Sequence, residues 1–188
     1  MFKDVRRGFL FTIATMVLFG GGYPLLIWGI ARIFPQQSEG SLIRRADGTI
    51  AGSSLIAQNF TKAQYFHPRP SAVDYNAAST GGSNYGPSNP DHLKRVRERL
   101  ESVASSEGVP PKLVPSEMIT ASGAGLDPHI PPNAAELQIA RVARARNVDP
   151  ARIRELVRVH TAGPALGVFG RARVNVLELN LALDKELR

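Results

Sequence analysis

Residues 81–84 read Gly-Gly-Ser-Asn, a combination that could surround a phosphate group, because glycines let a ligand approach main-chain N–H groups closely. The lysine that a Walker loop places on the phosphates is absent, since no Gly-Lys-Ser or Gly-Lys-Thr follows. A second loop carries Gly123-Ala124-Gly125, and Pro128 stands where a dinucleotide-binding motif has its third glycine. Neither loop therefore holds a complete phosphate-binding motif.

Three titratable residues in the loops could bind a metal ion or support a hydrolase: His67, Asp127 and His129. Asp127 and His129 come from one loop, and two ligands from one loop seldom complete a metal site. The Gly-x-Ser-x-Gly elbow of common serine hydrolases does not occur in the sequence. We therefore expect these side chains to form hydrogen bonds that structure the loops, with a hydrolase site as the alternative.

Tyr65–Pro90 is a stretch of 26 residues that is rich in glycine, proline, asparagine and serine and has almost no aliphatic periodicity. A disordered linker would be poor in aromatic residues, yet this stretch contains Tyr65, Phe66, Tyr75 and Tyr85. We predict a loop ordered by tyrosine packing, with Asn and Ser side chains bonding nearby main-chain N–H groups. The alternative is a binding module in which the three tyrosine rings stack on a peptide or glycan.

Three predicted helices must position these loops, and each starts at a proline. They begin at Asn89-Pro90, Pro131-Pro132 and Asp149-Pro150, where Asn and Asp can cap the first turn and proline fits its geometry. The first is predicted to end at Gly108. The apolar residues that recur at helical spacing are Leu93, Val96, Leu100 and Val103; Ala135, Ile139, Val142 and Ala143; and Ile153, Leu156 and Val157.

Three shorter segments complete the predicted fold. Ala165–Phe169 is predicted to be a short strand, whereas Leu55–Phe60 fits either a strand or a helix. Alternating leucines in 175–186 fit a strand, but Asn175 and Glu178 have the spacing of a capping box, so we favour a helix. The predicted fold class is a small α/β or α+β domain.

Gly8–Ala31 is a run of 24 residues without a charged side chain. As a helix it is about 36 Å long, which exceeds the roughly 30 Å hydrocarbon core of a bilayer. Gly20-Gly21-Gly22 and Pro24 are tolerated in lipid, and the glycines offer a close-packing face. A cleaved signal peptide ending at Gly29-Ile30-Ala31 is the alternative, but its apolar region would span only about 7–15 residues. We therefore predict a retained single transmembrane helix.

Basic residues on the two sides of this segment bear on its orientation. Each side has three within about 20 residues, so the positive-inside count is even. They are Lys3, Arg6 and Arg7 before the segment and Arg32, Arg44 and Arg45 after it. A seven-residue tail with three basic groups is hard to translocate. We therefore expect 1–7 to be a cytoplasmic tail, 8–33 an anchor in the plasma (inner) membrane, and 34–188 a periplasmic or other extracytoplasmic domain.

The charge balance excludes several classes of protein. The chain has 188 residues and no cysteine, which excludes a disulfide framework and a thiolate zinc site. Residues 34–188 hold 19 basic and 15 acidic residues, and this net +4 is not the footprint of a nucleic-acid-binding domain. We expect the basic residues on the predicted helices to lie on solvated faces; the alternative is that they bind phospholipid head groups or an acidic partner surface. They are Lys94, Arg95, Arg97 and Arg99; Arg141, Arg144 and Arg146; and Arg152, Arg154 and Arg158.

Several short motifs between residues 52 and 183 can be compared with known families. They are Gly52-Ser-Ser-Leu-Ile56, Tyr65-Phe-His-Pro-Arg-Pro-Ser71, Tyr75-Asn76, Gly81-Gly-Ser-Asn84, Asn89-Pro90, Ala121-Ser-Gly-Ala-Gly-Leu-Asp-Pro-His-Ile130 and Val174-Asn-Val-Leu-Glu-Leu-Asn-Leu-Ala-Leu183. In this order, after a single N-terminal anchor, they resemble the KdpC family, the C subunit of the Kdp potassium-transporting ATPase. Ala124 is the visible departure, because a serine or glycine-like small residue is expected there.

The resemblance implies a non-catalytic subunit of an ATP-driven potassium importer. Its partners would be a channel-like potassium-selecting subunit, a P-type ATPase subunit and a very small accessory peptide, together with membrane lipid. The Asp-Lys-Thr-Gly-Thr phosphorylation sequence of P-type pumps does not occur in this sequence, which agrees with an accessory role.

Two roles are implied by this family. One is a catalytic chaperone that raises the ATP affinity of the ATP-hydrolysing subunit, and it makes Gly81, Gly82, Ser83 and Asn84 the candidate nucleotide contacts. The other is to stabilise the complex and cover the outer mouth of the potassium path. We favour the structural role, because the predicted topology puts the loops outside and ATP inside; no cofactor is expected, and ATP would act through the complex. The alternatives are a membrane-anchored periplasmic hydrolase and a peptide- or glycan-binding module.

Overall fold

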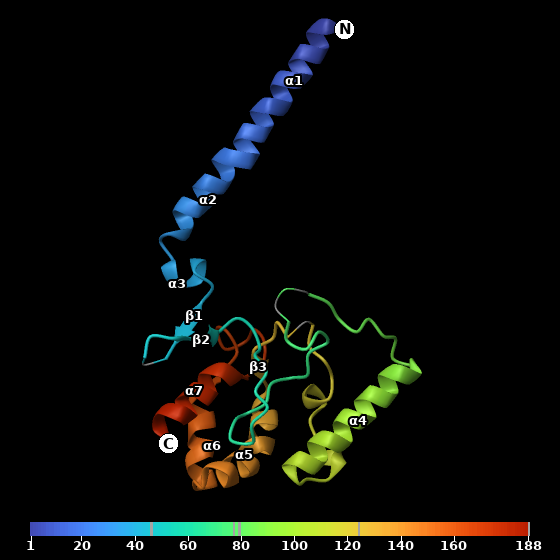
Figure 1. Cartoon of the computed structure of the whole chain (residues 1–188), viewed down its shortest axis with the longest axis vertical. Helices are drawn as coiled ribbons and strands as arrows, with labels where there is room; N and C mark the ends of the chain where they lie inside the picture. The colour runs from blue at the N-terminus through green and yellow to red at the C-terminus, as the bar shows by residue number, and fades with distance from the viewer. Residues whose placement is uncertain (46, 77, 79, 124, 188) are drawn as a thin grey trace. The chain divides into compact units, whose positions relative to one another are not determined.

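The computed structural model of the chain describes residues 1–45, 47–76, 78, 80–123 and 125–187. The chain forms two compact units, Met1–Leu42 and Ile43–Arg188. Helices and strands occur together in the chain, and Figure 1 traces them from the N-terminus to the C-terminus. The expected mixed α and β fold, preceded by an apolar N-terminal helix, is confirmed.

The first unit is mostly helical. α1 (Phe2–Val17) continues through a π-helical turn, η1 (Leu18–Gly22), into α2 (Tyr23–Ala31), and the short α3 (Pro35–Ser38) follows. Pro24 accounts for the wider turn, because proline has no N–H to donate and its ring crowds the carbonyl four residues before it. In the wider turn the Tyr23 N–H donates to the carbonyl of Leu18, five residues earlier.

The helix predicted over Gly8–Ala31 is confirmed and begins earlier, at Phe2. Among the described residues, Phe2–Ala31 is the one helix long and apolar enough to cross a membrane. None of the residues in α1, η1 or α2 is buried. A helix this apolar needs an apolar environment from outside the chain, because water solvates such a surface poorly.

The described residues of the second unit form short strands, two 3-10 turns and four longer helices. Its elements are β1 (Leu42–Arg44), β2 (Ile50–Ser53), α4 (Pro90–Glu107), η2 (Pro111–Leu113), η3 (Ser116–Met118), β3 (His129–Ile130), α5 (Pro132–Arg146), α6 (Pro150–Val159), β4 (Thr161–Ala162), β5 (Arg173–Asn175) and α7 (Val176–Glu186). β1 and β2 form a two-stranded sheet. The other sheet has the order β3-β5-β4, and both of its pairings are antiparallel.

The capping residues found in the sequence start the helices as predicted. The Asn89 side chain accepts hydrogen bonds from the N–H groups of Asp91 and His92, and that of Asp149 accepts from Ala151. Asn175 caps α7 by accepting from the two N–H groups that follow Val176, which confirms a helix over most of 175–186. Side-chain caps satisfy N–H groups that have no partner within the helix.

The apolar core lies where α5 and α7 pack against the three-stranded sheet and α6 packs against these two helices. In Figure 1 these helices lie together in the lower part of the second unit, and α4 lies to one side. The fully buried side chains include Ile139, Val142, Ile153, Val174, Leu179 and Leu183. The predicted stripes of α5 and α6 are confirmed as core, whereas α4 buries its stripe only in part and leaves Leu93 exposed.

Two strand assignments require correction. Ala165–Phe169 is not a strand but a tight turn, closed by an isolated bridge between its first and last residues. Leu166 and Gly167 have φ values of 52° and 77°, in the left-handed region, which breaks an extended chain. Leu55–Phe60, left open between strand and helix, is neither, because turn residues and an irregular segment follow β2.

Side chains from two helices hold the start of the long loop in place. Gln138 in α5 accepts from the His67 N–H at 2.7 Å and donates to the His67 carbonyl at 3.2 Å. Asn180 in α7 bonds the main-chain groups of Phe66 in the same way. The main-chain groups of Phe66 and His67 are therefore paired with buried carboxamide side chains instead of with neighbouring strands.

Two arginines expected on solvated faces are instead structural. Only 9% of the Arg141 side chain and 8% of the Arg146 side chain are exposed. Arg141 forms an ion pair with Glu107 at 2.9 Å and donates to the carbonyls of Ala63 and Tyr65. Arg146 donates to the Gln64 carbonyl and forms an ion pair with Asp184. Both arginines therefore tie the segment that leads into the long loop to the helices.

Candidate functional site

A polar hollow of about 360 Å³ lies where the long loop meets α4 and the second loop. Of the four residues predicted to contact a nucleotide, Ser83 lines it. Gly82, Ser83 and Asn84 are exposed. The other lining residues are Ser71, Ala72, Asp74, Tyr85, His92, Arg95, Arg99, Thr120 and Ala121.

The cations of the hollow come from one face of α4. His92, Arg95 and Arg99 are spaced i, i+3 and i+7, which places them on the same side of a helix. The Arg95 guanidinium lies 5.3 Å from the centroid of the Tyr85 ring, an arrangement that favours a cation–π contact. Arg99 donates to the Ile119 carbonyl at 3.4 Å, which ties α4 to the second loop.

The floor of the hollow is shaped by hydrogen bonds within the long loop. The Ser71 hydroxyl accepts from the N–H groups of Val73 and Tyr75 at 3.1 and 3.0 Å. The Tyr75 hydroxyl donates to the Arg69 carbonyl at 2.7 Å, and burial raises the pKa of this hydroxyl to about 12. Tyr75 therefore stays neutral and acts as a structural donor.

The second loop packs against the first and completes the wall of the hollow. The Ser122 N–H donates to the Pro70 carbonyl at 2.7 Å, and Ser71 and Ser122 form a parallel bridge. Gly125 approaches the Tyr75 ring so closely that a Cβ atom would stand 3.0 Å from it. Its neighbour Ala124, the departure from the family pattern, lies outside the described residues.

The hollow has the chemistry of an anion site with a stacking face. Two guanidinium groups and the hydroxyls of Ser71, Ser83 and Thr120 can bond phosphate-like oxygens. Asp74 also lines the hollow, and its carboxylate offsets one of the two guanidinium charges. The Tyr85 ring adds an aromatic surface. No group of three or more His, Asp or Glu side chains in the described part of the chain could hold a metal ion.

The residues considered for a hydrolase are engaged in loop structure. The His67 ring nitrogen Nε2 lies 3.3 Å from the Lys62 carbonyl, and burial, aided by the charge of Arg141, lowers the pKa of His67. Asp127 forms an ion pair with Arg69 at 3.1 Å and accepts from the His129 N–H at 3.0 Å. These bonds confirm the loop-structuring role expected for Asp127.

The three tyrosines do not form a shared stacking surface. The Tyr65 hydroxyl donates to Asp184 at 2.9 Å, and its ring packs against Phe60 with a centroid distance of 5.4 Å. Tyr75 is half-buried with its hydroxyl on the Arg69 carbonyl. Of the three, only Tyr85 lines the polar hollow. Tyrosine packing thus orders the loop, as predicted.

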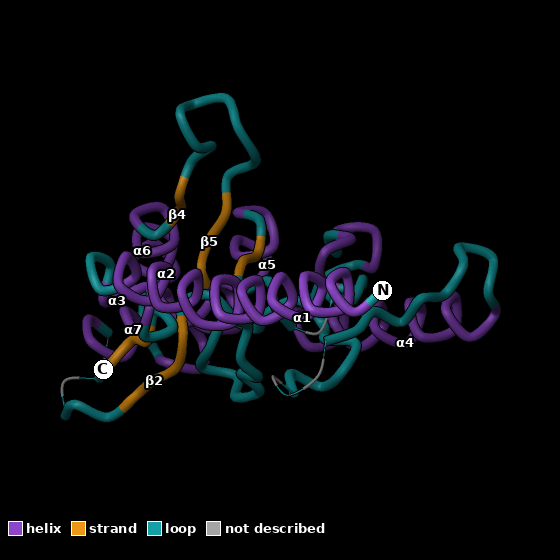
Figure 2. The backbone as a smooth tube through the Cα atoms, turned by 90° about the horizontal axis from the view of Figure 1, so that it is seen from above, coloured by secondary structure: helices purple, strands orange, loops and turns teal. Residues whose placement is uncertain are grey.

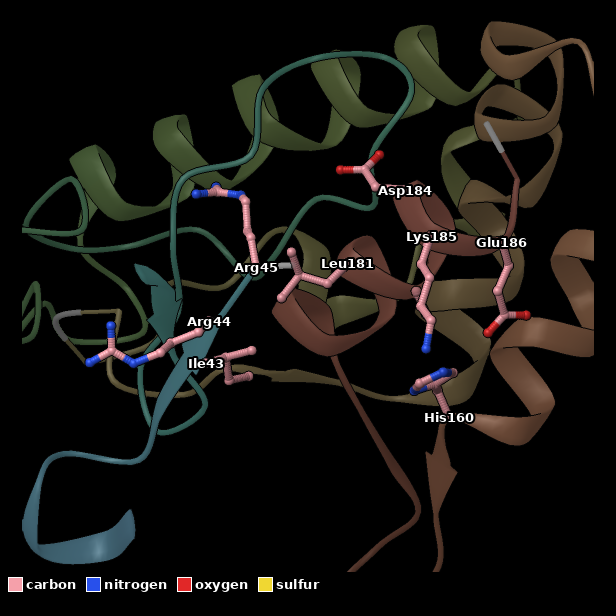
Figure 3. A pocket seen from close by; sticks show the side chains of 9 residues that line it. Ile43, Arg44, Arg45, His160, Leu181, Asp184, Lys185 and Glu186 are labelled. Carbon is pink, nitrogen blue, oxygen red and sulfur yellow. The ribbon is translucent and has the colours of Figure 1, made fainter. Parts of the chain in front are cut away.

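A second hollow, of about 420 Å³, lies between β1 and the end of α7 (Figure 3). Figure 3 shows Lys185 and His160 lying together on one side, and Arg44 and Arg45 coming from the other. Three of its charged side chains are engaged locally: Arg44 donates to the Gly48 carbonyl, Arg45 to the Ile50 carbonyl, and Asp184 pairs with Arg146. We therefore place the candidate site at the polar hollow on α4.

The sequence makes Ser83, which lines the hollow, a candidate contact, but does not identify the residues that give the hollow its charge. The sequence pattern predicts that Arg95 and Arg99 belong to a solvated helix face, and nothing in it connects His92 or Tyr85 with them. The signal that points to them is the spacing of 92, 95 and 99 along one helix face. Nothing local in the sequence indicates that Asp74 or Thr120 lines the same hollow as these α4 residues, because both come from irregular loops.

Comparison with known proteins gives the family. A family model for KdpC, described as the K+-transporting ATPase c chain, matches residues 5–185. The potassium-transporting ATPase KdpC subunit of Trichlorobacter lovleyi is 47% identical over 186 residues, 97% of each chain. That of Cereibacter sphaeroides is 46% identical over 185 residues, 98% of each chain. That of Caldanaerobacter subterraneus subsp. tengcongensis is 44% identical over 190 residues, all of this chain and 98% of the relative.

The match includes both the apolar N-terminal helix and the folded unit that carries the polar hollow. Such coverage, at this identity, confirms the resemblance drawn from the motifs. This chain belongs to the KdpC family, the c chain of K+-transporting ATPases.

Proposed function

We propose that this chain is a non-catalytic subunit that assembles and stabilises an ATP-driven potassium importer. Its partners in this proposal are a channel-like potassium-selecting subunit, a P-type ATPase subunit and a small accessory peptide. The observation that carries the proposal is the helix Phe2–Ala31, which is uncharged from Gly8 onward and has no buried residue. Lipid and neighbouring membrane helices can supply the apolar surroundings that such a helix needs.

The proposed topology is a cytoplasmic tail 1–7, an anchor 8–33 in the inner membrane and an extracytoplasmic domain 34–188. Support comes from the short basic tail, with Lys3, Arg6 and Arg7, and from the hydrophobic length of the helix. The glycines and the wide turn at Leu18–Gly22 give the helix a surface on which another helix can pack closely.

A topology reporter fused after residue 188 tests the orientation. Activity of a reporter that works only outside the cytoplasm is the expected result, and activity of a cytoplasmic reporter would reverse the proposed topology. Assembly is tested by replacing residues 8–33 with an unrelated single-span helix that keeps the tail and the domain. Wild type should co-purify with the other subunits and the replacement should not. Equal co-purification would show that the anchor sequence has no role in assembly.

A second candidate function is to raise the ATP affinity of the ATP-hydrolysing subunit. The polar hollow favours it, because Arg95, Arg99 and Ser83 can bind phosphate oxygens and Tyr85 can stack on a base. In the proposed topology the hollow and cytoplasmic ATP are on opposite sides of the membrane, so direct contact would require the opposite orientation. An effect on ATP affinity would then pass through the anchor, since a coupling of about 1–3 kcal/mol needs no direct contact.

The two functions are separated by the KM for ATP of the complete complex. We propose the variant Arg95→Ala with Arg99→Ala, and Arg97→Ala as the matched control, because Arg97 is an exposed arginine of the same helix outside the hollow. A several-fold rise in KM for the double variant alone would support nucleotide contact at the hollow. An unchanged KM in a correctly assembled complex would leave assembly as the function.

A further inference from the structure

The loop that joins β4 to β5, which we call the hairpin tip (Gly163–Ala172), exposes three large apolar side chains. Leu166 is 91% exposed, Val168 75% and Phe169 66%. Figure 2 shows the loop between β4 and β5 extending beyond the ends of both strands. The other large apolar side chains described as exposed in this unit are separated from one another in the sequence: Ile50, Leu55, Leu93, Leu113, Leu126 and Val159.

The hairpin tip has a defined shape of its own. Ala165 and Phe169 exchange main-chain hydrogen bonds at 2.8 and 2.9 Å, and the Gly167 N–H donates to the Pro164 carbonyl at 3.1 Å. Leu166 has a φ of 52°, in the left-handed region, which is costly for a residue with a Cβ atom. The turn therefore keeps a strained backbone at Leu166, and its apolar side chains lie in solvent, where they do not contribute to the apolar core of the unit.

The base of the hairpin tip is positively charged. Arg171 and Arg173 are both exposed. The 22 residues between Glu155 and Glu178 contain no acidic side chain, so no carboxylate nearby in the sequence offsets these charges. The surface thus combines a small apolar knob with a cationic base.

We propose that the hairpin tip docks into an apolar recess, bordered by carboxylates, on another subunit of the K+-transporting ATPase complex. This inference rests on the proposed function in assembly and names the surface that performs it. Apolar burial would drive the contact, and the two arginines would meet the acidic border and fix its orientation. The main-chain hydrogen bonds of the tip fix its shape, and a folded protein surface can offer a recess complementary to that shape.

Two other occupants fit the hairpin tip less well. A second copy of the chain meeting tip to tip would bring four arginines together, and like charges across an interface are unfavourable. Insertion into hydrocarbon would remove water from the main-chain groups of an irregular turn, and lipid cannot replace those hydrogen bonds. Both remain as outcomes that the test must be able to detect.

The first experiment places a photo-crosslinking amino acid at Leu166 of the full chain, co-expressed with the complete complex in membranes. The expected product is a covalent link to another subunit, mapped by mass spectrometry to a site with apolar and acidic residues. The same amino acid at Leu113, an exposed leucine of η2, should give no such product. A link to lipid or to a second copy, or no link within an intact complex, would overturn the proposal.

The second experiment measures how much of the chain stays with the complex after washing. Leu166→Ser with Phe169→Ser, and separately Arg171→Glu with Arg173→Glu, should each raise its dissociation rate at least tenfold. Leu113→Ser and Arg97→Glu are the matched controls, and they should behave like wild type. All four variants alter exposed side chains, so their melting temperatures should be unchanged.

The outcomes separate the two proposals. If wild type fails to co-purify with the complex, the proposed function fails, whatever the variants do. If wild type co-purifies and the tip variants dissociate no faster than the controls, assembly stands and the hairpin tip has no part in it.

Discussion

Asn180 and Phe66 are paired as two strands of a sheet would be, although one partner is a side chain. The Asn180 carboxamide donates through Nδ2 to the Phe66 carbonyl at 2.9 Å and accepts through Oδ1 from the Phe66 N–H at 2.8 Å. Phe66 is fully buried and Asn180 is 1% exposed. Because buried main-chain groups need partners, this one side chain makes it possible for the loop to pass through the core.

Removing this carboxamide should destabilise the domain strongly. Asn180→Ala leaves one buried N–H and one buried carbonyl without partners, which costs on the order of 2–4 kcal/mol of unfolding free energy. Urea unfolding of the full chain in detergent, followed by circular dichroism, measures the loss. Asn133→Ala, at an exposed asparagine of α5, should change the unfolding free energy by less than about 0.5 kcal/mol. Similar effects of the two substitutions would contradict the role given to Asn180.

The helices could be predicted because their signals are local. Asn89, Asp149 and Asn175 each cap N–H groups two or three residues away, so the sequence alone contains both partners of the bond. The strands of the larger sheet are only two or three residues long, too short for an alternating pattern to register. The apolar run Ala165–Phe169 predicts a strand, but this prediction is wrong, because the apolar side chains face solvent and do not contribute to a core.

The loop contacts could not be predicted, because they join residues that are far apart in sequence. Asn180 and Phe66 are 114 positions apart, and Gln138 and His67 are 71 apart. The same holds for the polar hollow, where Asp74, Arg99 and Thr120 meet from three separate segments. The residue types alone make Ser83 a candidate contact, but only the fold places Arg95 and Arg99 of α4 in the same hollow.

Gly125 should tolerate no side chain. Its φ of +68° is unfavourable for other residues, and a Cβ atom would stand 3.0 Å from Tyr75 Cδ1 and 3.3 Å from Ser71 Oγ. Gly125→Ala is therefore expected to lower the unfolding free energy by about 1–3 kcal/mol. Gly123→Ala in the same loop is the control, because nothing lies within 4 Å of its Cβ position. Thermal melting of both variants decides the prediction, which fails if Gly125→Ala melts with wild type.

The Glu107–Arg141 ion pair should matter far more than an exposed pair. Glu107 has 2% of its side chain exposed, and burial raises the pKa of this carboxyl although Arg141 opposes the change. Glu107→Ala leaves the Arg141 guanidinium buried without its counter-ion, which costs about 3–5 kcal/mol. Glu136→Ala removes the half-exposed partner of Arg154 and should cost under about 1 kcal/mol. Urea unfolding compares the two, and equal losses would refute the distinction.

His67 should make the stability of the domain depend on pH. Burial, with a contribution from Arg141, lowers the pKa of His67 below its ordinary value of 6.5. As pH falls through 6.5 the unfolded chain takes up a proton that the folded chain does not, so protonation favours unfolding. The stability that neutral His67 provides is therefore complete above about pH 7.5 and is lost as pH falls toward the lower pKa of the folded state.

The difference in unfolding free energy between wild type and His67→Gln isolates this effect, because Glu107 and the other titrating groups are common to both proteins. Gln cannot take up a proton, and the main-chain bonds of residue 67 to Gln138 do not depend on its side chain. We expect wild type to lose stability relative to the variant between about pH 7.5 and pH 5, as linkage requires for a lowered histidine pKa. Urea unfolding at several pH values measures it, and a difference that stays constant over this range would show that the surroundings of His67 do not disfavour its protonated form.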